Sequence, residues 1–221
     1  PWQLAPPLIA ALIAVPVLTI AAQLFAPSGG VWGHLVDTVL WRYIGNTVWL
    51  GLGVGLGTLV IGTGTAWLCV MCRFPGRGVL EWALLLPLAV PTYAIAFTYA
   101  GMFDFAGPVQ AGLREAFGWT RHDYWFPEVR SLGGAIAVMS LVLYPYVYLL
   151  ARASFLNQSV CALEIGRTLG RGSWASFFAI GLPLARPALA GGVSLALMEA
   201  LSDFGTVQYY GVDTFTTGIY R

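Results

Sequence analysis

The chain has 221 residues, of which 58% are hydrophobic and only 10% are charged, and its net charge is +1. Ordinary soluble domains carry about 25% charged residues, so this composition excludes a water-soluble domain, and the small net charge gives no electrostatic basis for binding nucleic acid. The chain contains no lysine, which excludes a Walker-type ATP site because that site requires one.

Long uncharged windows separate the few charges and predict membrane-spanning helices. A transmembrane helix needs roughly 20 mostly apolar residues to cross about 30 Å of hydrocarbon, and each window is long enough for one crossing. We therefore expect residues 1–221 to form a single all-α transmembrane domain. Its five predicted spans cover residues 4–26, 44–71, 80–102, 132–152 and 185–207.

Arginines in the connections between spans predict the orientation, because cytoplasmic loops carry an excess of positive charge. The turn after the second span holds Arg73 and Arg77, and the connection between spans four and five is also rich in arginine. We expect both connections and the N-terminus to be cytoplasmic. The longer and more acidic connection between spans three and four is expected to lie outside.

That outer connection contains an amphipathic stretch followed by an aromatic cluster. Apolar residues recur at helical spacing from Val109 to Phe117, and four aromatic residues follow between Trp119 and Phe126. The pattern predicts a helix at the membrane interface. Contact with an external partner is the alternative interpretation.

Glycines mark the second span, and prolines mark the third and fourth. The second span holds six glycines between Gly51 and Gly64, and small residues let transmembrane backbones approach closely, so we interpret them as packing positions. Pro87, Pro91 and Pro145 each remove a backbone hydrogen bond and bend their helices. They are hinge candidates, although such kinks are ordinary in membrane helices.

The fifth span carries two acidic residues. Residues 187–198 are uncharged, and Glu199 and Asp203 follow. Residues four apart share one face of a helix, and carboxylates inside a membrane usually line cavities or ion paths. We take both as candidates for a translocation path. The alternative places Asp203 at the outer interface and pairs Glu199 with a neighbouring helix.

The connection between spans four and five predicts a folded cytoplasmic element over residues 160–183. A short helix over 160–169 is expected to stop at Gly170, Ser173 can cap a second helix, and Pro183 is expected to break the chain before the fifth span. The second helix would present Trp174, Phe177 and Phe178, which suit burial against a partner.

This connection resembles the characteristic cytoplasmic loop of binding-protein-dependent ABC importers. The family pattern reads EAA, three residues, G, nine residues, I, one residue, LP. The chain matches it in all spacings and departs from it at Ile165 and Gly166, where the family prefers alanine. The positions matched to the family pattern are Glu164, Ile165, Gly166, Gly170, Ile180, Leu182 and Pro183.

A wider resemblance covers nearly the whole chain. Residues 86–93, 124–128 and 197–220 are similar to the ferric-iron permeases of that superfamily, whose subunits fuse two six-helix halves. The resemblance implies a MetI-like type I permease fold, with five helices of the N-terminal half present and the sixth missing. It also implies the bacterial inner membrane as the location and ferric iron, delivered by a periplasmic binding protein, as the solute.

The same resemblance implies the partners. Two ABC ATPase subunits would bind ATP and Mg²⁺, the second permease half would be fused or separate, and lipid would surround the spans, with no cofactor or nucleic acid on this chain. A hard trivalent cation prefers oxygen ligands, so Glu199, Asp203, Tyr209 and Tyr210 become transient ligand candidates. No stable metal site and no enzymatic activity are expected.

Three alternatives remain open. The first is an ABC permease for another solute, such as thiamine, a polyamine or an oxyanion. The second is a secondary transporter driven by an ion gradient. The third is a membrane-embedded enzyme, which the lack of clustered His, Cys or Ser/Lys residues disfavours.

Overall fold

The computed structural model describes residues 5–23, 37–158 and 172–220. The chain divides into two units, residues 1–41 and residues 42–221. Within the first unit, α1 (Ala5–Gln23) is an apolar helix that contains Pro16. All other elements considered below belong to the second unit, apart from the first two residues of α3.

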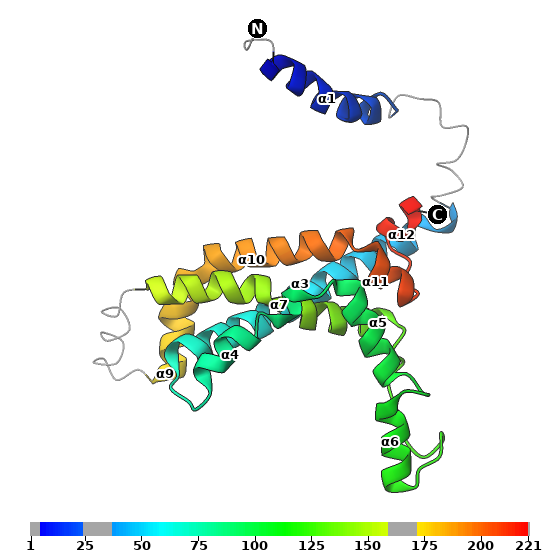
Figure 1. Cartoon of the computed structure of the whole chain (residues 1–221), viewed down its shortest axis with the longest axis vertical. Coiled ribbons are helices and arrows are strands. Elements are labelled where there is room, and N and C mark those ends of the chain that lie inside the picture. The colour runs from blue at the N-terminus through cyan, green and yellow to red at the C-terminus, as the bar shows by residue number, and fades with distance from the viewer. Residues whose placement is uncertain (1–4, 24–36, 159–171, 221) are drawn as a thin grey trace. The chain divides into compact units, whose positions relative to one another are not determined.

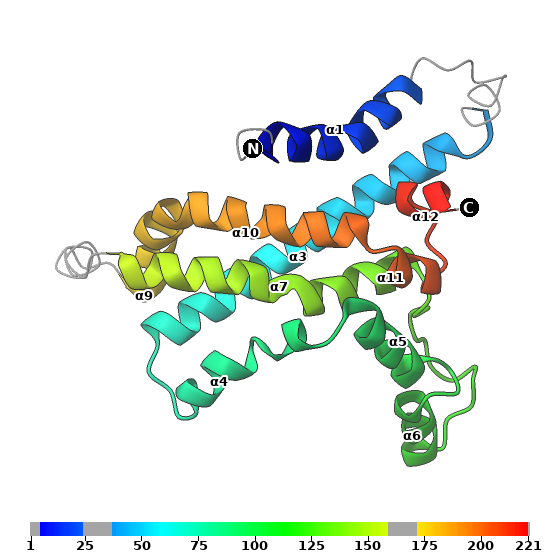
Figure 2. The same ribbon diagram turned by 45° about the horizontal axis from the view of Figure 1, so that its top comes forward.

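Three long helices lie side by side in the second unit: α3 (Leu40–Met71), α7 (Leu132–Asn157) and α10 (Leu182–Ser202) (Figures 1 and 2). In the part of the chain that the structure describes, three helices are long and apolar enough to cross a membrane, or four if one bent pair forms a single span. Among these helices α7 has the largest buried share, so it forms the centre of the packing. The count of five spans stays a prediction.

Glycines of α3 allow close contact with α7, which agrees with their interpretation as packing positions. A β-carbon on Gly53 would meet Ile136 at 2.7 Å, and one on Gly57 would meet the Ser140 hydroxyl. A β-carbon on Gly62 would approach the α7 backbone to 2.9 Å. Because only glycine lacks this atom, the two helices come close along this line.

The expectation of one continuous helix over residues 80–102 is wrong. The structure has α4 (Arg77–Ala83), the 3₁₀ turn η2 (Leu86–Ala89) and α5 (Thr92–Phe103), and the helical segments on either side of the break differ in direction by 99°. Val90 is extended, with φ of −121° and ψ of 135°. Its successor Pro91 disfavours the helical conformation at Val90 and cannot donate a backbone hydrogen bond.

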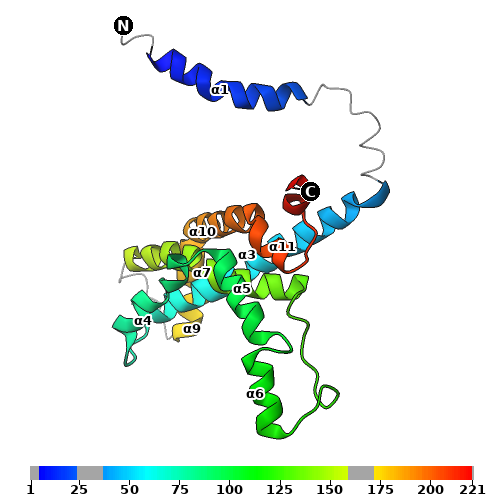
Figure 3. The same ribbon diagram turned by 45° about the vertical axis from the view of Figure 1, so that its right-hand side comes forward.

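The amphipathic helix predicted in the outer connection is present as α6 (Pro108–Phe117). Proline occupies its first turn, and Gly118 ends it in the left-handed conformation, with φ of 64°, where glycine avoids the steric cost of a side chain. Helix α5 packs against α7, and α6 extends away from the three long helices (Figure 3).

Two corrections concern the fifth predicted span. Pro183 does not break the chain, because α9 (Ser173–Ser176), the π-helical turn η3 (Phe177–Gly181) and α10 form one helix from Trp174 to Ser202. The N–H of Leu182 donates to the carbonyl of Phe177, five residues earlier, so the chain is already in a wide turn where proline follows. At the other end α10 stops at Ser202 rather than near residue 207, and α11 (Phe204–Tyr209) and α12 (Phe215–Tyr220) follow.

Candidate translocation site and coupling region

A cavity of about 260 Å³ lies where the broken segment faces α7 and α10. The chain from Pro87 to Thr92 forms one wall, α7 contributes Tyr146 together with two aliphatic residues, and α10 contributes Glu199. Two hinge candidates, Pro87 and Pro91, and one path candidate, Glu199, therefore line the same cavity. The sequence analysis did not single out Tyr146, because it stands between ordinary apolar residues of a span.

Glu199 is the charged member of this cavity. Among the described residues that line it, no other is ionisable at neutral pH. The residue is exposed, and its carboxylate has no ion-pair partner in the described part of the chain. A carboxylate at such a position can meet a passing solute, and it attracts cations and repels anions.

Asp203 does not join Glu199. Because α10 ends at Ser202 and Asp203 is extended, the expectation that the two carboxylates share one helix face is wrong. The Asp203 carboxylate instead caps α11: it accepts a 2.9 Å hydrogen bond from the N–H of Thr206 and a second from the Thr206 hydroxyl. Side-chain oxygens at this position satisfy the free N–H groups of a helix start.

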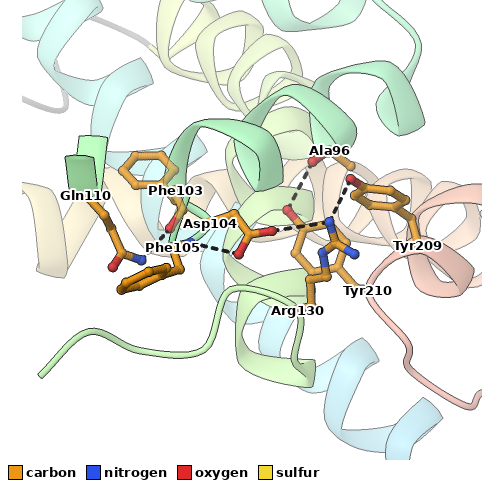
Figure 4. Close-up of polar contacts among 8 residues, drawn as sticks. All are labelled: Ala96, Phe103, Asp104, Phe105, Gln110, Arg130, Tyr209 and Tyr210. Atoms are coloured by element: carbon orange, nitrogen blue, oxygen red, sulfur yellow. Dashed lines mark hydrogen bonds and ion pairs between the residues drawn. The ribbon is translucent and has the colours of Figure 1, made fainter. Parts of the chain in front are cut away.

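The two tyrosines at the end of α11, Tyr209 and Tyr210, have different surroundings (Figure 4). Tyr210 is 1% exposed, and its hydroxyl donates to the carbonyl oxygen of Ala96 over 3.2 Å. Tyr209 is partly exposed and packs against Phe97, with ring centroids 5.1 Å apart. Tyr210 therefore serves the packing of α5, whereas Tyr209 lines a separate pocket beside α5.

Arg130 joins three segments outside the long helices. Its guanidinium lies 3.3 Å from the Asp104 carboxylate and 3.3 Å from the Tyr209 hydroxyl, and it sits over the Tyr209 ring (Figure 4). It thus connects the end of α5, the chain before α7 and the end of α11. The sequence carries no signal of this contact, because Arg130 is 26 residues from Asp104 and 79 residues from Tyr209 and no motif relates the three.

The outer connection also folds on itself. Arg114 of α6 donates to the Tyr124 hydroxyl and to the Phe105 carbonyl. The hydroxyl of Thr120 donates a hydrogen bond to the Asp123 carboxylate, and so does the N–H of Thr120. These two bonds, the hydroxyl's first in size, hold the pKa of the Asp123 carboxyl below its usual value. These bonds fix the loop after α6.

Pro145, the third hinge candidate, lies inside α7 and is buried. The helix continues on both sides of it, from Leu132 to Asn157. It does not line the Glu199 cavity, whereas its neighbour Tyr146 does. A hinge at Pro145 stays a prediction.

The predicted coupling segment is only partly described. Glu164, Ile165, Gly166 and Gly170 lie outside the described residues. The described part contains Ile180 in the π-turn and Leu182 and Pro183 in the first turn of α10.

The aromatic residues of this segment divide into exposed and buried ones. Trp174 is 67% exposed and Phe178 is 62% exposed, whereas Phe177 is buried against Trp67. The π-turn that carries Phe177 is also held from α7, since the Gln158 amide donates to the Gly181 carbonyl over 3.0 Å. The segment thus has an attached inner side and two large apolar side chains that remain uncovered.

At the same end of the bundle, α4 is attached to α7 by an ion cluster. Glu81 accepts hydrogen bonds from Arg77 at 2.8 Å and from Arg152 at 3.0 Å. The hydroxyls of Tyr144 and Tyr148 donate to the carbonyls of Leu84 and Glu81. One end of the broken segment is therefore held firmly, which concentrates any movement at the break itself.

No group of three or more His, Cys, Asp or Glu side chains suited to hold a metal ion occurs within the described ranges.

Comparison with known proteins places the chain beside permease proteins of several transport systems, and no family model matches it. It is 31% identical over 150 residues to the molybdenum transport system permease protein ModB of Escherichia coli, covering 68% of this chain and 62% of the relative. It is 27% identical over 178 residues to the Fe(3+)-transport system permease protein FbpB 2 of Haemophilus influenzae, covering 80% of this chain and 31% of the relative. It is 30% identical over 153 residues to the sulfate transport system permease protein CysT of Escherichia coli, covering 67% of this chain and 50% of the relative.

The chain spans between about a third and three fifths of the length of these relatives. Their systems handle chemically different solutes, so the ferric-iron permease is one relative among several. What the comparisons support is therefore similarity to transport permeases as a class.

Proposed function

We propose that this chain is a membrane permease of an ATP-driven importer of the bacterial inner membrane. The observation that carries the proposal is the 31% identity to a transport system permease over 68% of the chain. The lack of lysine adds to it, since the chain cannot bind ATP through a Walker motif and needs a partner for its energy. Two ABC ATPase subunits, a periplasmic binding protein and a second permease half complete the proposed assembly.

The solute passes, in this proposal, beside the broken segment. Pro87 and Pro91 hold the backbone out of a regular helix, and the cavity they form opens to Glu199 and Tyr146. Irregular backbone at membrane depth is tolerated where it lines a water-filled cavity. The partner ATPase drives the permease through residues 164–183, whose exposed Trp174 offers apolar contact. Movement of that segment reaches α10 directly, because one helix runs from Trp174 to Ser202.

Ferric iron is the proposed solute. A single carboxylate in the cavity, with no arginine among the lining residues described, favours a cation. The resemblance of residues 197–220 to ferric-iron permeases supports the same solute. A second candidate is an oxyanion, because relatives serve molybdenum and sulfate transport systems.

Replacement of Glu199 separates these two candidates. The full-length permease would be reconstituted into proteoliposomes with its ATPase and binding protein, and uptake of ferric iron, molybdate and sulfate would be measured. For ferric iron we expect Glu199→Gln to reduce uptake at least tenfold, while Glu115→Gln, an equal change on exposed α6, leaves it unaltered. Uptake of molybdate or sulfate that is undiminished or increased in Glu199→Gln would establish the oxyanion instead.

A further inference from the structure

A second and larger groove lies between α3 and the beginning of α10. It has a volume of about 720 Å³, and its walls are almost entirely apolar side chains of α3, the π-turn and α10, among them Leu59, Leu189 and Val193. Gly64 of α3 lines it, and a β-carbon built there meets nothing within 4 Å. The groove therefore has room for a long apolar occupant.

Two polar residues interrupt these apolar walls. Arg186 is the charged residue among the described lining residues, and it has no ion-pair partner in the described part of the chain. Thr63 is only 5% exposed, and its hydroxyl oxygen has no hydrogen-bond partner among the described residues.

The Thr63 hydroxyl differs from its neighbours on α3. Thr58 and Thr65 each donate to the carbonyl four residues earlier, over 2.8 and 2.6 Å, as hydroxyls in membrane helices commonly do. A buried hydroxyl without a partner is costly. The Thr63 oxygen is enclosed by the packing, like the unpaired oxygens of Ser140 and Ser176, so it makes the groove wall polar at this point without offering an open donor.

The spacing of these residues suits an amphiphile. Arg186 follows the π-turn by five residues, and Val193 lies roughly 10 Å further along the same helix. A long arginine side chain can reach a headgroup while its methylenes stay against apolar surface. The groove thus has a cationic end and continues along an apolar wall.

The groove is separate from the translocation cavity. Arg186 and Glu199 are 13 residues apart, which places them about 140° from each other around α10, and their cavities share no lining residue. A solute beside Glu199 therefore does not occupy the groove beside Arg186.

We propose that this groove binds an anionic phospholipid. The lipid phosphate pairs with Arg186, and an acyl chain lies along Leu59 and Val193. Basic pockets between transmembrane helices suit anionic headgroups, and free phosphate would leave the apolar walls uncovered. The inference needs only the membrane setting of the chain, so it holds or fails independently of the proposed transport activity.

Native mass spectrometry of the full-length protein, purified in detergent, tests the proposal. The protein would be titrated with phosphatidylglycerol and with phosphatidylcholine of identical acyl chains. Arg186→Gln is expected to weaken phosphatidylglycerol binding about fivefold, the effect of one basic residue near a charged headgroup, and to leave phosphatidylcholine unaffected. Arg73→Gln, which removes an exposed arginine outside the groove, is the matched control and should bind both lipids as the unaltered protein does.

Two further variants test the groove itself. Gly64→Leu adds a side chain at a point of the groove wall where a β-carbon meets nothing within 4 Å, and it is expected to abolish binding of both lipids. Thr63→Val, of equal shape, should leave both unchanged, because the Thr63 oxygen is enclosed. Melting temperatures identify any variant that fails to fold, in which case the remaining variants decide. Equal binding of the two lipids to unaltered protein, full phosphatidylglycerol binding by Arg186→Gln, or its displacement by inorganic phosphate would each overturn the proposal.

Discussion

Gly62 is the position on α3 where an added β-carbon would clash with the backbone of α7. A methyl group there would lie 2.7 Å from the β-carbon of Val147 and 2.9 Å from the Tyr144 carbonyl oxygen and the Tyr148 nitrogen. Two of these three atoms belong to the backbone of α7, so rotation of a side chain cannot relieve the clash. The helices must separate by about 0.5 to 0.7 Å, the shortfall from an ordinary contact of 3.4 Å.

A gap of that size forfeits roughly a quarter to a half of the dispersion energy at each affected contact, and overpacking a core costs about 1–3 kcal/mol. Alanine regains about 1 kcal/mol of helix propensity. Gly64→Ala gains the same propensity and meets nothing within 4 Å. The difference between the two variants therefore isolates the packing cost, about 1–3 kcal/mol in the free energy of unfolding.

The assay is thermal unfolding of the full-length protein in detergent, followed by circular dichroism. At about 2–4 °C per kcal/mol for a chain of this size, Gly62→Ala should melt roughly 2–12 °C below Gly64→Ala. Equal melting temperatures for the two alanine variants would show that α3 and α7 do not approach as closely as described.

Three further substitutions test other parts of the structure. Asp203→Ala removes the cap that accepts from Thr206, and we expect a loss of about 0.5–2 kcal/mol in the stability of α11, measured by hydrogen exchange; unchanged exchange would contradict the cap. Tyr210→Phe removes the hydroxyl that donates to Ala96, and unfolding should become easier by about 0.5–1.5 kcal/mol, whereas an unaltered melting temperature would count against that bond. Gly118→Ala places a side chain at φ of 64° and should cost about 1–2 kcal/mol; faster amide exchange at the end of α6 would show it, and equal exchange would refute the left-handed turn.

Much of the helical framework follows from local sequence. The uncharged window around α7 and the helical spacing from Val109 to Phe117 each predict a helix that the structure contains. The interpretation of the α3 glycines as packing positions holds for Gly53, Gly57 and Gly62, which lie at close contacts with α7, whereas a β-carbon at Gly64 would meet nothing within 4 Å. These features depend on the composition and periodicity of one segment, which is the information that a single sequence carries directly.

The features that failed depend on where a helix ends. The predicted spans continue through Pro91 and past Asp203, but the backbone leaves the helical conformation at Val90 and at Asp203. Pro183 shows the opposite error, because a π-turn before it lets the helix continue. A proline marks a possible break, and the hydrogen bonds around it decide whether one occurs.

The sequence predicts individual residues of the candidate site, but it does not predict that they line one cavity. Pro87, Pro91 and Glu199 were each chosen for separate reasons, and the 3₁₀ turn brings them to one cavity. The contact of Arg130 with Asp104 had no sequence signal, because contacts between distant segments follow from the tertiary fold alone.

The transport proposal depends on energy that enters through residues 164–183. Co-purification of an ATPase with the affinity-tagged full-length protein tests this dependence most directly. The comparison is with a variant in which residues 164–170 are replaced by a Gly-Ser linker of equal length, and its melting temperature would be checked against the unaltered protein. We predict that a stoichiometric ATPase accompanies the unaltered protein and is absent from an equally stable linker variant; an ATPase retained by the linker variant, or solute uptake by the permease with no ATPase present, would contradict the account.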